Sequence, residues 1–125
     1  MKSVLIDSDV LIEISRARNA DITSKWELLS RNPSPIICSP VSVAELWQGA
    51  LPHEHSMLEL LFDVLVCIPL DKAVARLAGD YLRQFAKSHR LQLGDALIAA
   101  TASIHGLQLW TRNRKHYPMK DIEFF

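Results

Sequence analysis

Short apolar runs alternate along this chain with longer segments of helical pattern. Four of these runs are predicted strands: residues 3–6, 36–38, 67–68 and 107–110. The first is β-branched and continuously apolar from Val4 to Ile6, which is typical of a strand that is covered on both faces. The alternation of strands and helices therefore predicts an α/β fold with a parallel sheet and helices on both of its faces.

The predicted helices begin at residues with strong capping preferences. Ser8 or Asp9 is expected to cap a helix that runs to about Arg18. Ser39-Pro40 supplies an N-cap and a first-turn proline for a helix through Trp47. Further helices are expected at residues 22–30, 55–65 and 71–88, and from Gly94-Asp95 to Gly106. The segment 55–65 is so rich in apolar residues that it is expected to be largely buried.

Length and composition fit a single domain that spans residues 1–125. No apolar stretch reaches the ~18 residues that a membrane span needs, and the first residues lack the pattern of a secretory signal. Cys38 and Cys67 have apolar neighbours and no CxxC spacing. This usage favours two buried thiols in a reducing cytoplasm over a disulfide.

Charge is unevenly distributed although the net charge is zero. Residues 1–82 hold 7 basic and 11 acidic side chains, a balance of −4, and residues 83–125 hold 7 and 3, a balance of +4. The total gives no global electrostatic reason to expect a nucleic-acid partner. The two halves could meet around one cleft or form ordinary solvated faces.

Four acidic residues follow predicted strands or open predicted helices, and each has an ordinary local explanation. Asp7 and Asp9 could serve as turn or N-cap residues. Glu45 could complete a capping box with Ser42, although the competing start at Ser39-Pro40 would leave it free. Asp95 could simply favour a helix N-terminus through the helix dipole.

Taken together, these residues suggest a cation site. Asp7 directly follows the first strand, Asn113 comes shortly after the last, and the predicted sheet brings Glu45 and Asp95 to the same edge. Carboxylates that converge in this way repel one another unless protons or a cation compensate them. Oxygen ligands without nearby Cys or His select Mg²⁺ or Mn²⁺ over zinc, and Mg²⁺ favours phosphate chemistry.

Four segments resemble, in order, the successive motifs of a PIN domain, specifically of a VapC-type toxin ribonuclease: VLIDSDVLIEI, SVAEL, LGDALIAATA and LWTRN. The resemblance covers essentially the whole chain. It implies a three-layer α/β/α domain with a central, mostly parallel sheet. It also implies Mg²⁺ or Mn²⁺, cleavage of RNA such as tRNA, a homodimer, and silencing by a cognate antitoxin protein in the cytoplasm.

The resemblance also implies the site residues. Asp7, Glu45 and Asp95 match the metal-binding acids, and Asn113 stands where many members carry a fourth acid. An amide adds no charge, so a second metal is less strongly implied. Asp9 departs from the usual Asn or small polar residue, and it could restore the missing charge or cap the helix.

Residues around these positions have supporting roles in this interpretation. A metal-activated water would attack the phosphodiester, and Ser8 and Thr111 would orient ligands or water, unless they are only structural hydroxyls. Three basic residues would hold RNA phosphates, unless they lie in a solvated loop: Arg112, Arg114 and Lys115. His116 is expected to contact phosphate or to have no role, and Lys120 is a further possible phosphate contact.

Three other readings remain open from sequence. In a haloacid-dehalogenase-type phosphatase, Asp7 would be the nucleophile, Asp9 the acid and Ser39 the strand-end hydroxyl, but a Lys and a late acidic pair have no obvious match. A receiver domain would need its phosphoacceptor at a strand end, whereas Asp63 falls in a predicted helix. A non-catalytic adaptor could use the acids to bind a basic peptide.

Overall fold

The structure is a computed structural model that describes residues 2–125. Its strands are β1 (Val4–Ile6), β2 (Ile36–Cys38), β3 (Val66–Cys67), β4 (Gln108–Trp110) and β5 (Glu123–Phe124). Its α-helices are α1 (Ser8–Arg16), α2 (Ala20–Ser30), α3 (Pro40–Gly49), α4 (His55–Val64), α5 (Lys72–His89) and α6 (Leu93–His105). Two short 3-10 helices complete it, η1 (Pro52–Glu54) and η2 (Arg114–His116).

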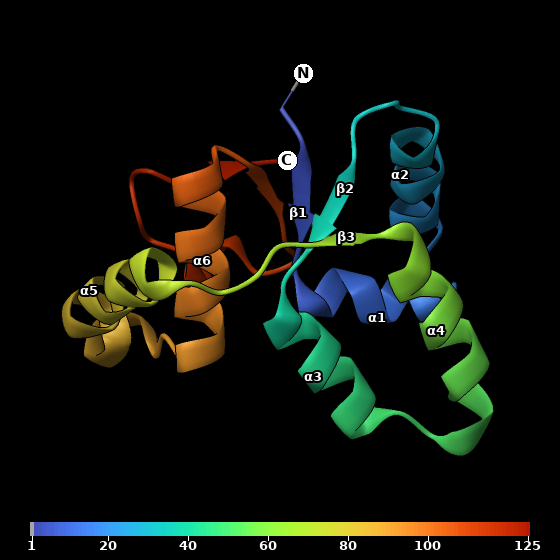
Figure 1. The fold of residues 1–125 in the computed structure, drawn as a ribbon, viewed down its shortest axis with the longest axis horizontal. Coiled ribbons are helices and arrows are strands. Elements are labelled where there is room, and N and C mark those ends of the chain that lie inside the picture. The colour runs from blue at the N-terminus through green and yellow to red at the C-terminus, as the bar shows by residue number, and fades with distance from the viewer. Residues whose placement is uncertain (1) are drawn as a thin grey trace.

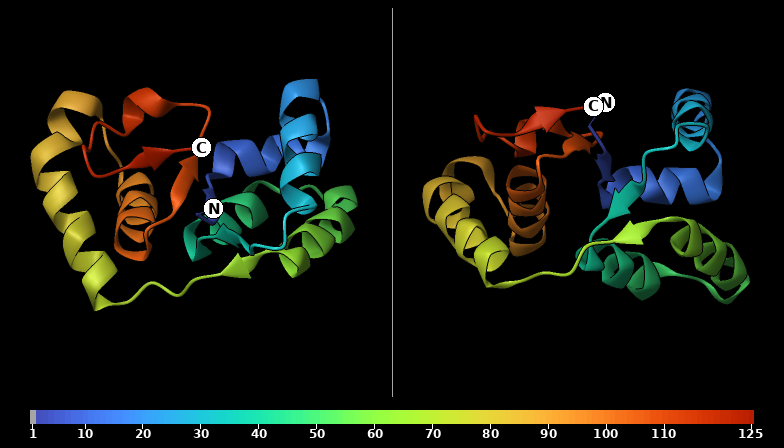
Figure 2. Two further views of the ribbon diagram at one scale, coloured as in Figure 1. Left: turned by 90° about the horizontal axis from the view of Figure 1, so that it is seen from above. Right: turned by 45° about the horizontal axis from the view of Figure 1, so that its top comes forward.

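The strands form one parallel sheet in the order β3-β2-β1-β4-β5. Helices α5 and α6 lie on one side of this sheet, and α1 to α4 lie on the other (Figure 1). Two further views show the same separation of the two helical groups (Figure 2). The predicted α/β/α arrangement is therefore confirmed, and the sheet is parallel throughout.

Alternate residues of each strand face the two helical layers, because successive side chains of a strand point to opposite sides. Leu5, Ile37 and Leu109 belong to the core under α5 and α6. Ile6 and Trp110 belong to the core under α1 to α4. Burial on both faces explains why these strands are continuously apolar.

The order in which the chain adds strands to the sheet reverses between β1 and β4. From β1 the chain adds β2 and then β3 on one side, and it then crosses back to place β4 on the other side. Ligand sites in such sheets lie at this switch, beyond the carboxyl ends of the strands. Asp7 follows β1 and Thr111 follows β4, so both residues stand at this position.

The start of α1 differs from the predicted cap at Ser8 or Asp9, and it confirms the local capping role that the sequence allowed for Asp7. Its N-cap is Asp7, whose Oδ1 accepts the Ser8 N–H, and neither Ser8 nor Asp9 has this role. The strand and the helix meet at Asp7. Its N–H donates to the Trp110 carbonyl at the end of the sheet, and its carbonyl accepts the N–H groups of Val10 and Leu11 in α1. The predicted cap of α3 is confirmed, since Ser39 Oγ accepts the Val41 N–H.

The expectation that α4 is largely buried is wrong. Only Leu58 and Leu61 are buried, because α4 is an outer helix that packs with one stripe. Other apolar side chains of this helix remain exposed: Met57, Leu60 and Val64.

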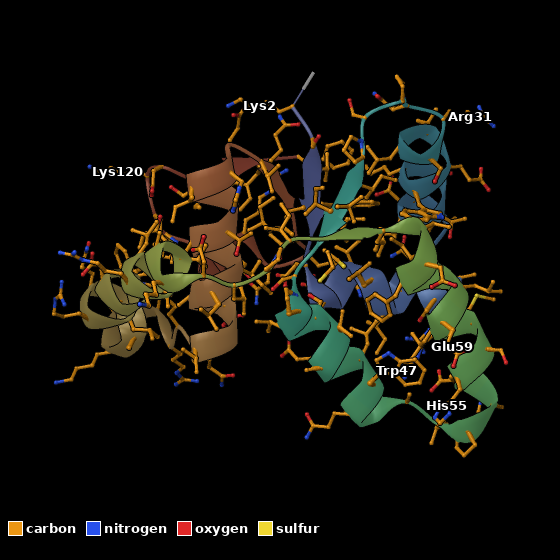
Figure 3. All side chains as sticks on the ribbon, viewed as in Figure 1. Lys2, Arg31, Trp47, His55, Glu59 and Lys120 are labelled. Atoms are coloured by element: carbon orange, nitrogen blue, oxygen red, sulfur yellow. The ribbon has the colours of Figure 1, made fainter. Side chains whose placement is uncertain are left out.

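An aromatic contact joins α3 to the start of α4. The ring of Trp47 from α3 lies edge-on to that of His55, the first residue of α4, with centroids 5.1 Å apart (Figure 3).

The two cysteines lie opposite each other on β2 and β3, and both are free thiols, as predicted. Burial was predicted for both, but only Cys38 is buried. Cys67 is exposed, as is its neighbour Val66, because β3 is a short strand at the edge of the sheet. Among the helices of residues 2–125, none is both long and apolar enough to cross a membrane.

Candidate active site

A pocket of about 190 Å³ lies at the carboxyl ends of β1 and β4. It is lined by Asp7, Ser8, Asp9, Glu45, Asp95, Asn113, His116 and Tyr117. The structure thus brings together the predicted acids, the predicted amide and one predicted hydroxyl, although they come from distant parts of the chain. We refer to this hollow as the acid pocket.

Asp7 is the most enclosed acid of the acid pocket, with 7% of its surface exposed. Its Oδ2 accepts hydrogen bonds from the Thr111 hydroxyl at 2.9 Å and from the Tyr117 hydroxyl at 2.7 Å. Burial nevertheless raises the pKa of Asp7 above its ordinary value, and the negative charge of Asp95 adds to this shift. The shift therefore favours the protonated form of this carboxyl group in the absence of a cation.

Asp9 lies beside Asp7 and is tied to the segment after β4. Its Oδ2 accepts the Arg112 backbone N–H at 3.1 Å. Its Oδ1 is buried and has no hydrogen-bond partner among the residues that the structure describes. Burial, and next the charge of Asp7, raise the pKa of Asp9 to about 6. Of the two roles that the sequence allowed, the cap of α1 belongs to Asp7 and not to Asp9, and Asp9 lies in the lining of the acid pocket.

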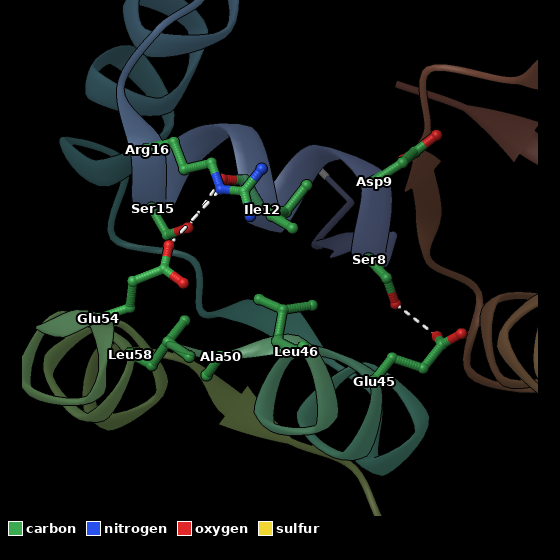
Figure 4. Close-up of a pocket in the computed structure, with 11 residues that line it drawn as sticks. Ser8, Asp9, Ile12, Ser15, Arg16, Glu45, Leu46, Ala50, Glu54 and Leu58 are labelled. Atoms are coloured by element: carbon green, nitrogen blue, oxygen red, sulfur yellow. Dashed lines mark hydrogen bonds and ion pairs between the residues drawn. The ribbon is translucent and has the colours of Figure 1, made fainter. Parts of the chain in front are cut away.

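Glu45 reaches the acid pocket from α3. The competing capping box with Ser42 does not set the start of this helix, because Ser39 is its N-cap. The Ser8 hydroxyl instead lies 2.8 Å from Glu45 Oε1 and 2.8 Å from the Ser42 hydroxyl. Ser8 and Glu45 point toward each other across the gap between α1 and α3 (Figure 4).

Asp95 enters from the first turn of α6. Its Oδ2 accepts the Gln92 N–H at 3.3 Å, so it also has the helix-start role that the sequence suggested. The preceding Gly94 lets α6 approach α3, because a Cβ on it would lie 3.2 Å from Val41 Cγ1 and 3.8 Å from Glu45 Oε2. Asn113 lies across the acid pocket, and its backbone N–H donates to the Thr111 hydroxyl at 3.1 Å.

The predicted phosphate-binding residues have different surroundings. Arg112 lies at the edge of the site, with its guanidinium 3.4 Å from the buried Glu13 of α1. The Arg114 guanidinium donates to the Phe125 carbonyl and stacks over the Phe124 ring, so it is turned toward β5. Lys115 is exposed.

Lys120 is not beside the acid pocket. It lines a separate hollow against α5, together with Tyr81 and Phe85. Its label in Figure 3 marks its place at the edge of the molecule, beside α5 and α6. His116, by contrast, lines the acid pocket.

Sequence reasoning missed two residues of the site. Tyr117 donates to Asp7, and Glu13 holds the side chains of Arg18 and Arg112. A tyrosine in the predicted loop carries no local signal of a long-range hydrogen bond. Glu13 gave a weak one, because it is an acidic residue within the largely apolar segment from Val10 to Ile14.

The donor set of the acid pocket fits a hard divalent cation. Among residues 2–125, none of the ion pairs involves Asp7, Asp9, Glu45 or Asp95. In the same part of the chain, no three His, Cys, Asp or Glu side chains already stand close enough to enclose an ion. The acids therefore share a pocket and lack a counter-charge, but ion binding would have to draw them closer together.

The structure lacks the groups that the phosphatase and receiver-domain interpretations require. Ser39, the strand-end hydroxyl of the phosphatase reading, is fully buried and caps α3. No lysine lines the acid pocket among the described residues. Asp63 lies in α4 and not at a strand end, which removes the receiver reading.

A second hollow of about 230 Å³ opens beside the acid pocket, between α1, α3 and α4 (Figure 4). Its lining is mostly apolar and includes Leu46 and Leu58, and the ion pair between Arg16 and Glu54 crosses it with an N–O distance of 3.6 Å. The two hollows share Glu45 in their linings, so they adjoin. We call this second hollow the apolar groove.

The PIN domain family model matches residues 4–122 of this chain. Ribonuclease VapC10 of Mycobacterium tuberculosis is 40% identical over 117 residues, which cover 93% of this chain and 86% of that protein. Ribonuclease VapC19 of the same organism is 33% identical over 116 residues, 92% of each chain. The chain therefore belongs to the VapC ribonuclease family of PIN-domain proteins.

Solved structures agree with this fold. The DNA-bound VapBC of Salmonella typhimurium matches with a TM-score of 0.83 at 19% identity, over 100% of this chain and 98% of that one. VapBC2 of Rickettsia felis, bound to a promoter DNA fragment, matches with a TM-score of 0.82 at 21% identity, over 98% and 97%. At these identities the likeness supports the three-layer architecture alone.

Proposed function

We propose that residues 1–125 form a single metal-dependent endoribonuclease domain that acts as the toxin of a toxin–antitoxin pair. One observation carries the proposal: Asp7, Asp9, Glu45 and Asp95 line one pocket at the switch point of the sheet, and none of them forms an ion pair with the part of the chain that the structure describes. Its relatives VapC10 and VapC19 are named ribonucleases, which supports RNA as the substrate.

Asp7, Glu45 and Asp95 would hold Mg²⁺ or Mn²⁺, and Asn113 could add its amide oxygen. When bound, such an ion lowers the pKa of a water ligand and neutralises charge on a phosphodiester. The attack of water would leave 5′-phosphate and 3′-hydroxyl ends. The carboxylates and the amide are the catalytic residues of this proposal.

The surrounding residues hold the acids and the substrate. The hydroxyls of Ser8 and Thr111 fix Glu45 and Asp7 through the hydrogen bonds described above. Arg112 stands at the edge of the acid pocket, where its guanidinium can exchange Glu13 for an RNA phosphate. Lys115 is free for a second phosphate contact, whereas Arg114 would first have to leave Phe125.

A cognate antitoxin is the expected protein partner. Solved structures that share this fold include VapBC assemblies and a toxin–antitoxin complex from Klebsiella pneumoniae. An antitoxin arginine placed on Asp9 or Glu45 would neutralise the acid pocket and block metal binding. The adjoining apolar groove offers space for apolar side chains of the same partner. We further expect a homodimer, and a cytoplasmic location.

The direct test is RNA cleavage by the purified protein. Total RNA and tRNA are incubated with Mg²⁺, with Mn²⁺ or with a chelator, and the new ends are mapped. We expect cuts with 5′-phosphate ends that need the metal and disappear in Asp95→Asn, while the circular dichroism spectrum of that variant stays native. Metal-independent cuts, or equal cleavage by the Asp95→Asn variant, would refute the proposal. An absence of cleavage together with tight binding of an arginine-rich peptide would favour the adaptor reading instead.

A further inference from the structure

The Asp7 carboxylate has three hydrogen-bond donors, and they are divided unequally between its two oxygens. The hydroxyls of Thr111 and Tyr117 both donate to Oδ2, at 2.9 Å and 2.7 Å. The Ser8 backbone N–H donates to Oδ1 at 2.8 Å. A carboxylate oxygen accepts about two hydrogen bonds, so Oδ2 is saturated and Oδ1 keeps one unused lone pair.

Tyr117 is placed rigidly enough to impose this division. The residue is 3% exposed and packs in the core between the sheet and α6, with Ala96 and Ala99 in the same cluster. The loop that follows it is fastened to the helices, because Asp121 accepts hydrogen bonds from Tyr81 and Ser103 at 2.5 Å and 2.6 Å. The Tyr117 hydroxyl is thus held in place by packing that does not depend on Asp7.

The same burial separates Tyr117 from the substrate. A side chain that is 3% exposed offers almost no surface to an RNA chain, although its edge lines the acid pocket. Any effect of this hydroxyl on the reaction therefore has to pass through Asp7. Partners that orient a metal ligand in this way influence metal affinity and activity strongly.

We propose that Tyr117 is a positioning residue for Asp7: with Thr111 it occupies Oδ2 and leaves Oδ1 as the oxygen that takes the metal. This inference rests on the proposed function, since it assumes that Asp7 is a metal ligand. It goes further than the proposed function because it assigns a different role to each oxygen of the Asp7 carboxylate. It also gives a role to a hydroxyl that the sequence did not single out.

The test compares two tyrosines that each donate a hydroxyl to an aspartate. Tyr117→Phe removes the hydroxyl on Asp7 and keeps the ring in the core. Tyr81→Phe is the matched control, because it removes the hydroxyl on Asp121, which keeps its bond from Ser103. Mn²⁺ binding is measured by the loss of the free-ion electron paramagnetic resonance signal, and RNA cleavage is measured as kcat and KM, both at one fixed pH.

For Tyr117→Phe we expect Mn²⁺ binding weakened by about tenfold and a lower kcat with an unchanged KM for RNA, as for other partners of metal ligands. Tyr81→Phe is expected to bind Mn²⁺ and cleave RNA like the wild type. Thr111→Val removes the other donor to Oδ2, together with the contacts of this hydroxyl to Asp9 Oδ2 at 3.4 Å and to the Asn113 N–H at 3.1 Å. It is expected to weaken Mn²⁺ binding at least as much as Tyr117→Phe, and it serves as a second test if Tyr117→Phe unfolds.

The outcomes separate this inference from the proposed function. If the wild type binds Mn²⁺ and cleaves RNA but folded Tyr117→Phe matches it in both assays, Tyr117 is only structural and the inference is wrong. The inference is equally wrong if Tyr81→Phe loses as much Mn²⁺ affinity as Tyr117→Phe. If the wild type itself binds no Mn²⁺, the proposed function fails, and the role of Tyr117 fails with it.

Discussion

The Ser8 hydroxyl lies 2.8 Å from Oε1 of Glu45 and connects the first turn of α1 to the middle of α3. The Ser42 hydroxyl lies 2.8 Å from the same Ser8 oxygen. A hydroxyl has one proton, so when Ser8 donates to Glu45, Ser42 is the donor to Ser8. This short chain of hydrogen bonds fixes the exposed Glu45 beside the buried Asp7.

Replacing Ser8 with alanine should therefore reduce activity far more than stability. We expect Ser8→Ala to lower cleavage about tenfold, because Glu45 loses the contact that orients it. The free energy of unfolding should change by less than about 1 kcal/mol, since the bond is partly exposed. Ser15→Ala is the control, because the Ser15 hydroxyl donates to the Ile12 carbonyl of its own helix. Equal activity losses in the two variants would contradict the prediction.

A methyl group at Gly94 should disturb the acid pocket. Its Cβ would lie 3.2 Å from Val41 Cγ1 and 3.8 Å from Glu45 Oε2, so α3 and α6 would have to separate slightly. We expect Gly94→Ala to lower cleavage several-fold. In Gly79→Ala nothing lies within 4 Å of the new Cβ, and the helix should gain about 0.5–1 kcal/mol of stability at unchanged activity. Unfolding curves and cleavage rates of both variants check this, and an unaffected rate in Gly94→Ala would contradict it.

Local sequence is enough to predict β1, β2 and β4, because each is a short apolar run that ends at a polar residue with a turn or capping role. It also predicts that Asp7, Glu45 and Asp95 lie at one edge of the sheet, where they line the same pocket, because the carboxyl ends of parallel strands share that edge. The prediction of the acid pocket thus needed only the order of the elements. It needed no knowledge of side-chain contacts.

Features that depend on long-range contacts could not be predicted. Strand β5 has two residues, Glu123 and Phe124, and exists because the loop after η2 folds back to pair them with Gln108 and Leu109. The Tyr117 hydroxyl reaches Asp7 only because of that same loop. No periodicity within the chain could have indicated either.

Local sequence rules also could not decide which of two nearby aspartates caps α1. Asp7 and Asp9 are both favourable N-cap residues. The end of β1 decides between them, because the Asp7 N–H is still paired with the Trp110 carbonyl in the sheet. The exposure of α4 was misjudged for a similar reason, since composition does not tell which stripe of a helix has a neighbour.

The metal-free protein should lose stability as the pH rises through the titration of Asp9. Its pKa is about 6 in the folded protein against 3.8 ordinarily, so between these values the folded state binds more protons than the unfolded state. The stability that the folded protein retains by keeping Asp9 protonated is fully present below about pH 3.8 and lost above about pH 6. The raised pKa of Asp7 changes the stability in the same direction. Partial solvent screening limits the Asp9 contribution to about 1 kcal/mol.

Thermal unfolding in a chelator, from about pH 4 to pH 7, measures this effect as the difference between the wild type and Asp9→Asn. The subtraction removes contributions of opposite sign, such as that of Asp121, whose pKa is lowered by the hydroxyls of Ser103 and Tyr81 despite its partial burial. We expect the wild type to lose stability relative to the variant as the pH rises. A difference that stays constant, or one that moves in favour of the wild type, would show that folding does not raise the pKa of Asp9.

The two cysteines should differ sharply in reactivity although they are paired in register on β2 and β3. Cys67 is exposed, whereas Cys38 is 1% exposed and its burial raises the pKa of its thiol to about 12. Alkylation needs an accessible thiolate, so iodoacetamide should modify Cys67 alone in the native protein and both residues in denaturant. Mass spectrometry of the digested protein measures the label at each site, and Cys67→Ser should abolish native labelling. Rapid native labelling of Cys38 would mean that α3 and α4 open away from the sheet far more often than this packing allows.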